Sequence, residues 1–244
     1  MINFNIEIAR TVFRVQCRNE SLRQRYADYI TDKEAELSVC ASDEELAETR
    51  ESYQELRKKY GDFKTADEAT IEALVHHKQV AGEMLRRGVL LVHGSAVAAN
   101  GKAYMFIAPS RTGKSTHTKL WLGLQDVGAY IINDDKPMLR PTEDGVIIYS
   151  TPWGQRRKPE KSEATLKAIA VLERGEKNII TPLGAKEMFP ELFRASLRGD
   201  KREETMLVMD LEDKILSSVC SYRLKCNTEP EAAQISYNMM ANND

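Results

Sequence analysis

The sequence predicts an α/β protein with a mixed β-sheet, preceded by a small α+β region. Short apolar runs predominate between residues 88 and 149, and the turn dipeptides Asn100-Gly101 and Asp144-Gly145 separate two pairs of them. Such dipeptides are typical of β-hairpins, so these neighbouring strands are expected to be antiparallel. Another run leads through a loop into a helical pattern, as in a parallel strand–helix unit. Hairpins combined with such a unit indicate a mixed sheet.

The first 87 residues differ in pattern from the rest, so we expect an N-terminal α+β region over 1–87 and a second region over 88–244. Alternating apolar and polar residues predict its strands, and capping boxes at Ser42–Glu45 and Thr65–Glu68 open two of its helices. Its expected strands lie at 3–9, 11–17 and 35–40, and its expected helices at 20–30, 42–60 and 65–87. The helical pair His76 and His77 points about 100° apart, which does not suit metal chelation, so both are expected at the surface or partly packed.

The second region carries short strands first and helices later. Glu-Pro at residues 229–230 marks a late helix start, because proline is favoured in the first turn of a helix. Strands are expected at 89–92, 96–99, 103–107, 129–132, 136–139, 146–149, 166–172 and 219–225, and helices at 114–124, 187–198, 201–216 and 228–240.

A phosphate-binding loop is predicted between the strand at 103–107 and the helix that follows. The segment reads Ala108-Pro-Ser-Arg-Thr-Gly-Lys-Ser-Thr116, with Ala108 where the strict motif has its first glycine. Lys114 is expected to reach the β- and γ-phosphates of a nucleotide, and the Ser115 hydroxyl to bind Mg²⁺. The alternative is a surface turn with a chance Gly-Lys-Ser. The residues expected to bind the nucleotide are Ser110, Arg111, Thr112, Gly113, Lys114, Ser115 and Thr116.

Two adjacent carboxylates, Asp134 and Asp135, follow the strand expected at 129–132. Beside a phosphate loop, one carboxylate can hold Mg²⁺ while the other takes the proton from an attacking hydroxyl. An Asx turn before Pro137 is the alternative interpretation. The phosphate loop favours the catalytic interpretation. His93 ends another apolar run, and a lone histidine after a strand is usually structural.

Three segments stand in a fixed order along the chain, namely His93-Gly-Ser-Ala96, Arg111–Thr116 and Asp134-Asp135. This order resembles the nucleotide-binding core shared by HPr kinase/phosphorylase and phosphoenolpyruvate carboxykinase. The resemblance is closer to a group of HPr-kinase-related proteins of unsettled role. The segments shared with that group are Gly113–Trp121, Ile132–Pro137, Thr151–Trp153 and Leu172–Gly175.

The resemblance implies a phosphoenolpyruvate carboxykinase/HPr kinase-like P-loop core that uses ATP and Mg²⁺. It implies Asp134 as catalytic base and Asp135 as the metal-associated carboxylate, although these two roles are interchangeable. It also brings His93 into the site, where a neutral imidazole can ligate a metal or hydrogen-bond a phosphate oxygen.

The chain departs from these relatives at two places. Arg111 stands where they usually have glycine. After Thr-Pro-Trp they usually have Gly-Lys and a glycine-rich loop, whereas this chain has a basic segment over 154–161. Arg156 in that segment is expected to stabilise the charge of a transferring phosphoryl group. The alternative is a solvated charge cluster.

Composition excludes several classes of protein. The 35 Lys and Arg residues nearly balance 37 Asp and Glu, and a net charge of −2 argues against nucleic acid as a partner. No apolar stretch has the length of a membrane span and the start of the chain lacks a signal-peptide pattern, so a cytoplasmic location is expected, with no membrane partner. The four cysteines form no Cys-x-x-Cys pair, so neither zinc nor disulfides are expected.

These observations predict an ATP- and Mg²⁺-dependent kinase. The resemblance favours transfer to a hydroxyl over simple ATP hydrolysis, so the acceptor is expected to be either Ser or Thr of a protein or peptide or a small molecule such as serine. The alternative is a nucleotide-binding regulatory or scaffold protein with little turnover, inside a peptide-modification system. The sequence is compatible with a homo-oligomer.

Overall fold

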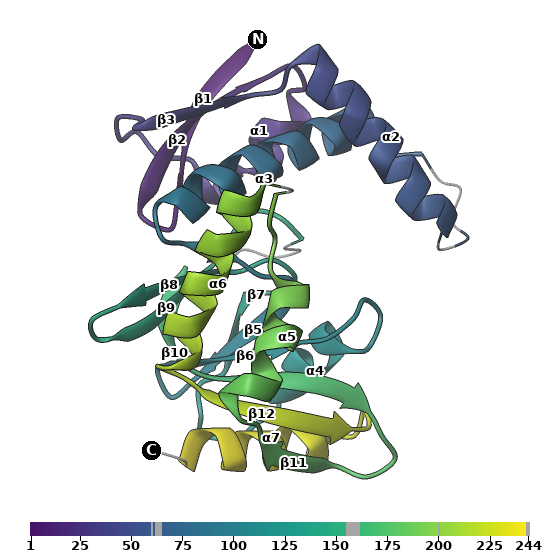
Figure 1. The fold of residues 1–244 in the computed structure, drawn as a ribbon, viewed down its shortest axis with the longest axis vertical. Helices are drawn as coiled ribbons and strands as arrows, with labels where there is room; N and C mark the ends of the chain where they lie inside the picture. The colour runs from purple at the N-terminus through teal and green to yellow at the C-terminus, as the bar shows by residue number, and fades with distance from the viewer. Residues whose placement is uncertain (60, 62–64, 155–161, 200, 243–244) are drawn as a thin grey trace. The chain divides into compact units, whose positions relative to one another are not determined.

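A computed structural model describes residues 1–59, 61, 65–154, 162–199 and 201–242 (Figure 1). The chain divides into two compact units, Met1–Glu83 and Met84–Asp244. The sequence pattern placed the division after residue 87. Each unit is described by itself.

The first unit contains a three-stranded sheet and helices, as its alternating and capped segments predict. β1 and β2 form an antiparallel hairpin, and β3 pairs with β2 in parallel. The hairpin turn, Ala9-Arg10, has both residues in the left-handed region, which suits the twist of a two-residue hairpin. The elements are β1 (Ile2–Ile8), β2 (Thr11–Cys17), α1 (Ser21–Arg25), the 3₁₀ turn η1 (Ala27–Tyr29), β3 (Leu37–Cys40), α2 (Asp43–Lys59) and α3 (Glu68–Arg86), which continues into the second unit.

One of the two predicted helix caps is confirmed, and the other lies two residues further on. Ser42 and Glu45 form the predicted capping box, in which the Glu45 amide donates to Ser42 Oγ at 3.2 Å and the Ser42 amide donates to Glu45 Oε2 at 2.9 Å. The second prediction was wrong in position, because α3 begins at Glu68 and its cap is Asp67. The Asp67 carboxylate accepts the Thr70 amide at 2.7 Å.

The histidine pair on α3 is buried, which corrects the expectation that it would lie at the surface or be partly packed. His76 is 1% exposed and His77 is 5% exposed. One turn before His76, the Glu72 carboxylate accepts the backbone amides of Arg18 at 2.7 Å and Asn19 at 3.3 Å. This face of α3 is therefore tied to the segment after β2, which removes His76 from solvent. Burial lowers the pKa of His76.

Over its described residues, the second unit is built on a nine-stranded mixed sheet, which confirms the predicted mixed α/β class. The β5–β6 and β8–β9 pairs are the two predicted hairpins. A strand that we did not predict, β11, pairs with β12 and contains Pro182. The strands are β4 (Leu90–Leu91), β5 (Gly94–Ala99), β6 (Lys102–Ile107), β7 (Tyr130–Asn133), β8 (Met138–Thr142), β9 (Gly145–Tyr149), β10 (Glu163–Arg174), β11 (Ile179–Pro182) and β12 (Cys220–Cys226).

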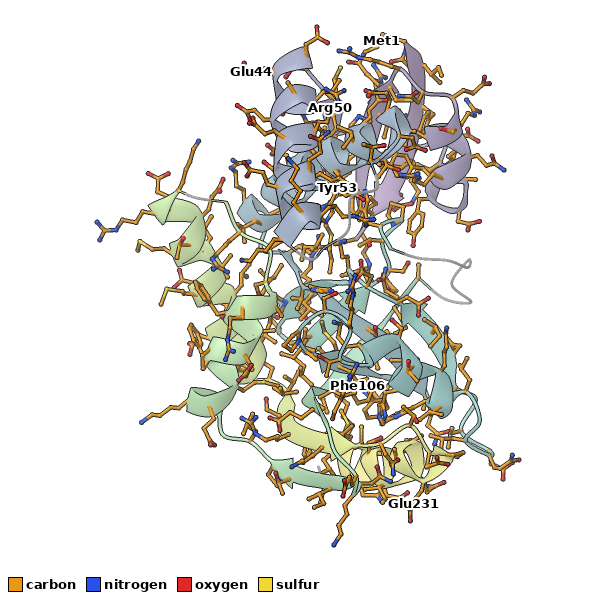
Figure 2. All side chains as sticks on the ribbon, turned by 90° about the vertical axis from the view of Figure 1, so that its right-hand side faces the viewer. Met1, Glu44, Arg50, Tyr53, Phe106 and Glu231 are labelled. Carbon is orange, nitrogen blue, oxygen red and sulfur yellow. The ribbon has the colours of Figure 1, made fainter. Side chains whose placement is uncertain are left out.

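Helices cover both faces of this sheet (Figure 1). Side chains alternate along β6, so Met105 and Ile107 face one apolar cluster while Tyr104 and Phe106 face another. The first cluster includes residues of α5 (Ala185–Ala195) and α6 (Arg202–Leu216). The second includes residues of α4 (Lys114–Trp121) and α7 (Pro230–Asn242). Phe106 is labelled inside this unit in Figure 2.

The directions of the strands bring several chain segments to one edge of the sheet. β6, β10 and β12 are parallel neighbours, β5 is antiparallel to β6, and β7 is antiparallel to β5. The ends of β6, β7, β10 and β12 and the start of β5 therefore lie at the same edge. In the described residues no helix has the length and apolar character needed to cross a bilayer.

Candidate active site

The predicted phosphate loop joins β6 to α4 at this edge. Gly113 precedes α4 with a φ of 124°, a conformation that strains any other L-residue. Arg111 has a φ of 65°, also in the left-handed region. Glycine adopts that conformation without a Cβ penalty, so Arg111 holds this turn at a cost. Ser110, Arg111 and Thr116 are exposed to solvent at the loop.

An arginine from β10 holds the loop in this conformation. Arg174 donates through Nη2 to the Arg111 carbonyl at 2.5 Å and through Nε to the Thr112 carbonyl at 3.3 Å. In a trans peptide the carbonyl and the next amide point in opposite directions, so the amides of Thr112 and Gly113 face away from Arg174. The sequence analysis did not predict this role, although Arg174 lies in the Leu172–Gly175 segment that carries part of the resemblance.

Lys114 is a buried residue at the start of α4, and its side chain points back toward the first residues of the loop. Its side chain donates to the carbonyls of Ala108 at 2.9 Å and Pro109 at 3.4 Å. Burial lowers the pKa of Lys114, while the negative charge of Asp135 acts in the opposite direction. The amine is thus held where a bound anion can replace weak carbonyl acceptors with a charged partner.

Two hydroxyls join the start of α4 to the carboxylate pair. Ser115 Oγ donates to the Asp134 carbonyl at 3.2 Å and lies 3.3 Å from Ser95 Oγ. Ser95 Oγ donates to the same carbonyl at 2.6 Å. These contacts join the start of α4 to the backbone of the segment that carries the predicted carboxylates. The contact between Ser95 and Ser115 was not predicted from the sequence.

Asp135 lies between two basic side chains. Its Oδ1 is 3.1 Å from His93 Nε2, and its Oδ2 accepts from Lys136 Nζ at 2.9 Å. Burial acts to raise the pKa of this carboxyl, but the hydrogen bond from His93 and the charge of Lys136 outweigh it and hold the pKa well below its usual range. Asp135 is therefore ionised at neutral pH. The partnership with Lys136 was not predicted.

The carboxylate segment is fixed by Asn133, which is fully buried. Its Oδ1 accepts the amides of Asp135 at 2.9 Å and Lys136 at 2.7 Å, which is an Asx turn. Its Nδ2 donates to the carbonyl of Thr151 at 3.1 Å. The Asx turn is therefore confirmed, and the catalytic interpretation of the two carboxylates stays a prediction beside it.

The Thr-Pro-Trp segment continues this packing to Gly154. Gly154 has a φ of 75°, and a Cβ built on it would collide with the Asp135 side chain. Glycine at this position thus lets the backbone approach the carboxylate. The predicted residue Arg156 lies outside the described residues.

The donors near the loop are compatible with magnesium. In the part of the chain that the structure describes, no group of three His, Cys, Asp or Glu side chains is placed to hold a metal ion. Mg²⁺ in nucleotide sites does not need such a cage, because it uses one or two carboxylates, substrate phosphates and water. The Ser115 hydroxyl and the Asp135 carboxylate are donors of this kind.

Comparison with known proteins adds little to this geometry. No family model and no curated protein matches the sequence. Among solved structures, the HPr(Ser) kinase/phosphatase from Coxiella burnetii is similar with a TM-score of 0.37 and 8% identity, covering 63% of this chain and 99% of that chain. A likeness this weak supports no argument about function, so the function is argued from the residues of the site.

Proposed function

We propose that this protein is an ATP- and Mg²⁺-dependent kinase that transfers a phosphoryl group to a hydroxyl acceptor. The observation that carries the proposal is the Asp134 carbonyl, which accepts hydrogen bonds from both Ser95 and Ser115. This carbonyl joins the start of α4, which carries the buried Lys114, to the segment that carries the two carboxylates. Phosphoryl transfer needs mainly such positioning and charge neutralisation.

Each residue of the candidate site has a separate role in the proposed phosphoryl transfer. The amides of the loop and Lys114 bind the phosphates, and Ser115 with Asp135 would hold Mg²⁺, which neutralises charge on the β- and γ-phosphates. Asp134 accepts the proton of the acceptor hydroxyl while the oxygen of that hydroxyl bonds to the γ-phosphorus. The bond between the γ-phosphorus and the bridging oxygen of the β-phosphate breaks at the same time, which releases ADP. His93 and Lys136 hold Asp135 ionised, and Lys136 adds positive charge near the transferring group.

A second candidate is a nucleotide-binding regulatory protein with little turnover. The observation that favours it is that His93 and Lys136 already occupy the two oxygens of Asp135. A carboxylate neutralised in this way has less need of a metal ion. For the kinase, the acceptor that we propose is a Ser or Thr hydroxyl of a protein or peptide, or free serine.

The test is to incubate the protein with Mg²⁺ and ATP labelled at the γ-phosphate, together with free serine, Ser- and Thr-containing peptides or an extract of the source cells. The kinase proposal predicts a labelled phosphate ester. Asp134→Asn is expected to lower the transfer rate by about a hundredfold or more, within the range for a lost general base, while binding of ATP is kept.

Asp144→Asn is the matched control, because Asp144 is an exposed aspartate in the β8–β9 turn. It is expected to transfer phosphate at the normal rate. Tight ATP binding with no label in any acceptor would favour the regulatory candidate, and an active Asp134→Asn protein would reject Asp134 as the base.

A further inference from the structure

Outside the candidate site, α6 carries a buried carboxyl that the proposed phosphoryl transfer does not use. Glu212 is fully buried, on a stretch of α6 that also gives Leu211 and Ile215 to an apolar cluster. Its Oε1 lies 2.7 Å from the hydroxyl of Ser196, the residue that follows α5. Its Oε2 has no hydrogen-bond partner among the described residues. A fully buried, unpaired carboxyl is rare in proteins, so its position here needs an explanation.

The contacts of the Ser196 hydroxyl depend on the proton of Glu212. Ser196 Oγ lies 2.9 Å from the Leu192 carbonyl oxygen and 2.7 Å from Glu212 Oε1, but a hydroxyl has only one proton to donate. An ionised carboxylate takes that proton and leaves the carbonyl contact without one. A protonated carboxyl donates to Ser196 Oγ, which then donates to the carbonyl, so both hydrogen bonds are made. Burial favours this protonated state, because it raises the pKa of Glu212 to about 7.

The charged groups around this carboxyl leave it without an ion pair in the described part of the chain. Arg198, which follows α5, lowers its pKa through its positive charge. On α5, Glu191 and Arg194 pair with each other at 2.8 Å. On β8, Leu139 belongs to the apolar cluster that α6 joins, so side-chain alternation directs Arg140 to the other face of the sheet. The hydrogen bond with the hydroxyl after α5 is therefore the main polar contact of the carboxyl.

The segment that follows α5 is bonded directly to the backbone of His93. The His93 amide donates to the Ala195 carbonyl at 2.7 Å. Ser196 forms a β-bridge with Val92, the residue before His93. Because Ser196 is also the partner of Glu212, the carboxyl of α6 is connected to the backbone that carries the histidine.

The other side of this short stretch is paired with the carboxylate segment. The Gly94 amide donates to the Asp135 carbonyl at 2.9 Å, and His93 Nε2 lies 3.1 Å from the Asp135 carboxylate. The backbone around His93 is thus held between two neighbours, one connected to Glu212 and one that carries Asp135. The position of the imidazole against the carboxylate depends on both.

We propose that Glu212 is a positioning residue of the candidate site, which acts through Ser196 on the contact between His93 and Asp135. The inference rests on the proposed function, because it gives Glu212 a role in phosphoryl transfer. While the carboxyl is protonated, its hydrogen bonds hold the segment after α5 against the His93 backbone. Loss of the proton as the pH rises through about 7 removes one of these bonds, so the segment loosens and transfer slows.

The first experiment measures hydrogen exchange of the His93 amide by NMR, which needs no substrate. Glu212→Leu keeps an apolar side chain of similar size in the core, so the protein is expected to fold. Exchange at His93 is expected to be about fivefold to tenfold faster at constant pH, as for the loss of one hydrogen bond. Glu212→Gln keeps a donor to Ser196 and is expected to exchange normally. Glu203→Leu, at an exposed glutamate of α6, is the matched control and should also exchange normally.

The second experiment measures turnover. Glu212→Leu is expected to lower it about tenfold with ATP affinity kept, and Glu212→Gln is expected to keep most of the rate. In His93→Ala the contact with Asp135 is already absent, so adding Glu212→Leu should cause little further loss. As the pH rises through about 7, the rate of the unmodified protein is expected to fall relative to that of Glu212→Gln.

Two results would overturn the inference. One is unchanged exchange at His93 in Glu212→Leu, and the other is an equal loss of turnover from Glu212→Leu with and without His93. If Glu212→Leu does not fold, Ser196→Ala removes the same link from the other side, and the same faster exchange and slower turnover are expected. Failure of the proposed function looks different, because the unmodified protein would then label no acceptor. The role of Glu212 in transfer would be overturned with it, whereas exchange at His93 would still depend on Glu212.

Discussion

Two polar networks meet on the short helix α4, and they differ in charge and exposure. At its start, Lys114 and Ser115 belong to the candidate site together with Asp135, whose side chain is 31% exposed and has two basic partners. One turn later, His117 and Trp121 belong to a network that is closed to solvent. The same eight-residue helix thus carries a charged, open network and a neutral, closed one.

The closed network joins α4 to α7. Trp121 Nε1 donates to His117 Nε2 at 3.2 Å and to Ser236 Oγ at 3.0 Å, and His117 Nε2 lies 3.0 Å from the same hydroxyl. His117 Nδ1 lies 3.8 Å from Cys226 Sγ. Burial lowers the pKa of His117 to about 4, so the ring is neutral at physiological pH.

The difference between the networks indicates their roles. Ionised groups retained at a solvent-accessible edge contribute little to stability, but they can act on a ligand. Neutral groups that satisfy one another inside the core fix the helix that carries the loop. Substitutions in the first network should therefore affect binding and turnover, and substitutions in the second should affect folding.

The largest expected effect is on the closed network. Trp121→Ala removes a fully buried indole that packs on Tyr104 at 4.8 Å and Phe106 at 5.6 Å between ring centroids. It is expected to lower the free energy of unfolding by about 4 kcal/mol, the usual range for a buried large aromatic. Urea unfolding followed by circular dichroism measures this. A loss below about 1 kcal/mol would contradict a structural role for the network.

The next effect belongs to the open network. Lys114→Ala is expected to weaken ATP binding by about a hundredfold, because a charge-assisted contact to phosphate is worth about 3 kcal/mol at most. Calorimetry measures the affinity, and the urea midpoint should stay close to normal. Lys119→Ala, at an exposed lysine of the same helix, is the control and should change neither quantity. Unchanged ATP affinity in folded Lys114→Ala would remove the loop assignment.

A smaller effect is expected at His93. His93→Ala removes one partner of Asp135 and leaves Lys136 in place, so we expect turnover to fall about ten- to a hundredfold with ATP affinity nearly kept. The readout is the rate of phosphoryl transfer once an acceptor is known. His93→Gln keeps a side-chain donor and should recover part of the rate. Normal turnover in His93→Ala would make this histidine structural.

The last prediction concerns pH. An unfolded histidine has a pKa near 6.5, whereas His117 in the folded protein has a pKa of about 4. The unfolded state therefore binds more protons below pH 6.5, and stability falls as the pH drops from 6.5 toward 4. His117→Gln lacks this contribution, so the difference in unfolding free energy between the two proteins should change by about 1.4 kcal/mol per pH unit in that window.

Glu212 has the opposite pH dependence, so it also changes the free energy of unfolding with pH in each protein of this measurement. Burial raises its pKa to about 7, with Ser196 as its hydrogen-bond donor at 2.7 Å. Its contribution is present at low pH and is lost as the pH rises from 4.5 through 7. Both proteins in the comparison contain Glu212, so its contribution cancels in the difference. A pH-independent difference would contradict a neutral buried His117.

Much of the fold was predictable from local pattern. The turn residues Asn100 and Gly101 both adopt the left-handed conformation that this turn type requires, and they form the β5–β6 hairpin as expected. The loop before Lys114 was predictable because strand, loop and helix are consecutive. β11 was not, because its short segment contains a proline and gains its pairing only from β12, far along the chain.

The partners inside the site could not be predicted, because they depend on strand order and register. Arg174 reaches the loop because β10 pairs with β6 in parallel, and Gly154 approaches Asp135 because Thr151 bonds to Asn133. The buried positions of His76 and His77 likewise depend on what packs on α3. The assignments of Asp134 and Arg156 remain predictions.

The contact between α4 and α7 also has a consequence for the order in which the chain is made. His117 and Ser236 are 119 residues apart. At 5–20 residues per second, synthesis of that stretch takes about 6 to 24 seconds. An eight-residue helix has little stability alone. During this interval Trp121 of α4 also lacks its packing against α7. The helix that follows the loop therefore gains its final packing late in synthesis. A nascent chain stalled before α7 should leave α4 accessible to chaperones and proteases.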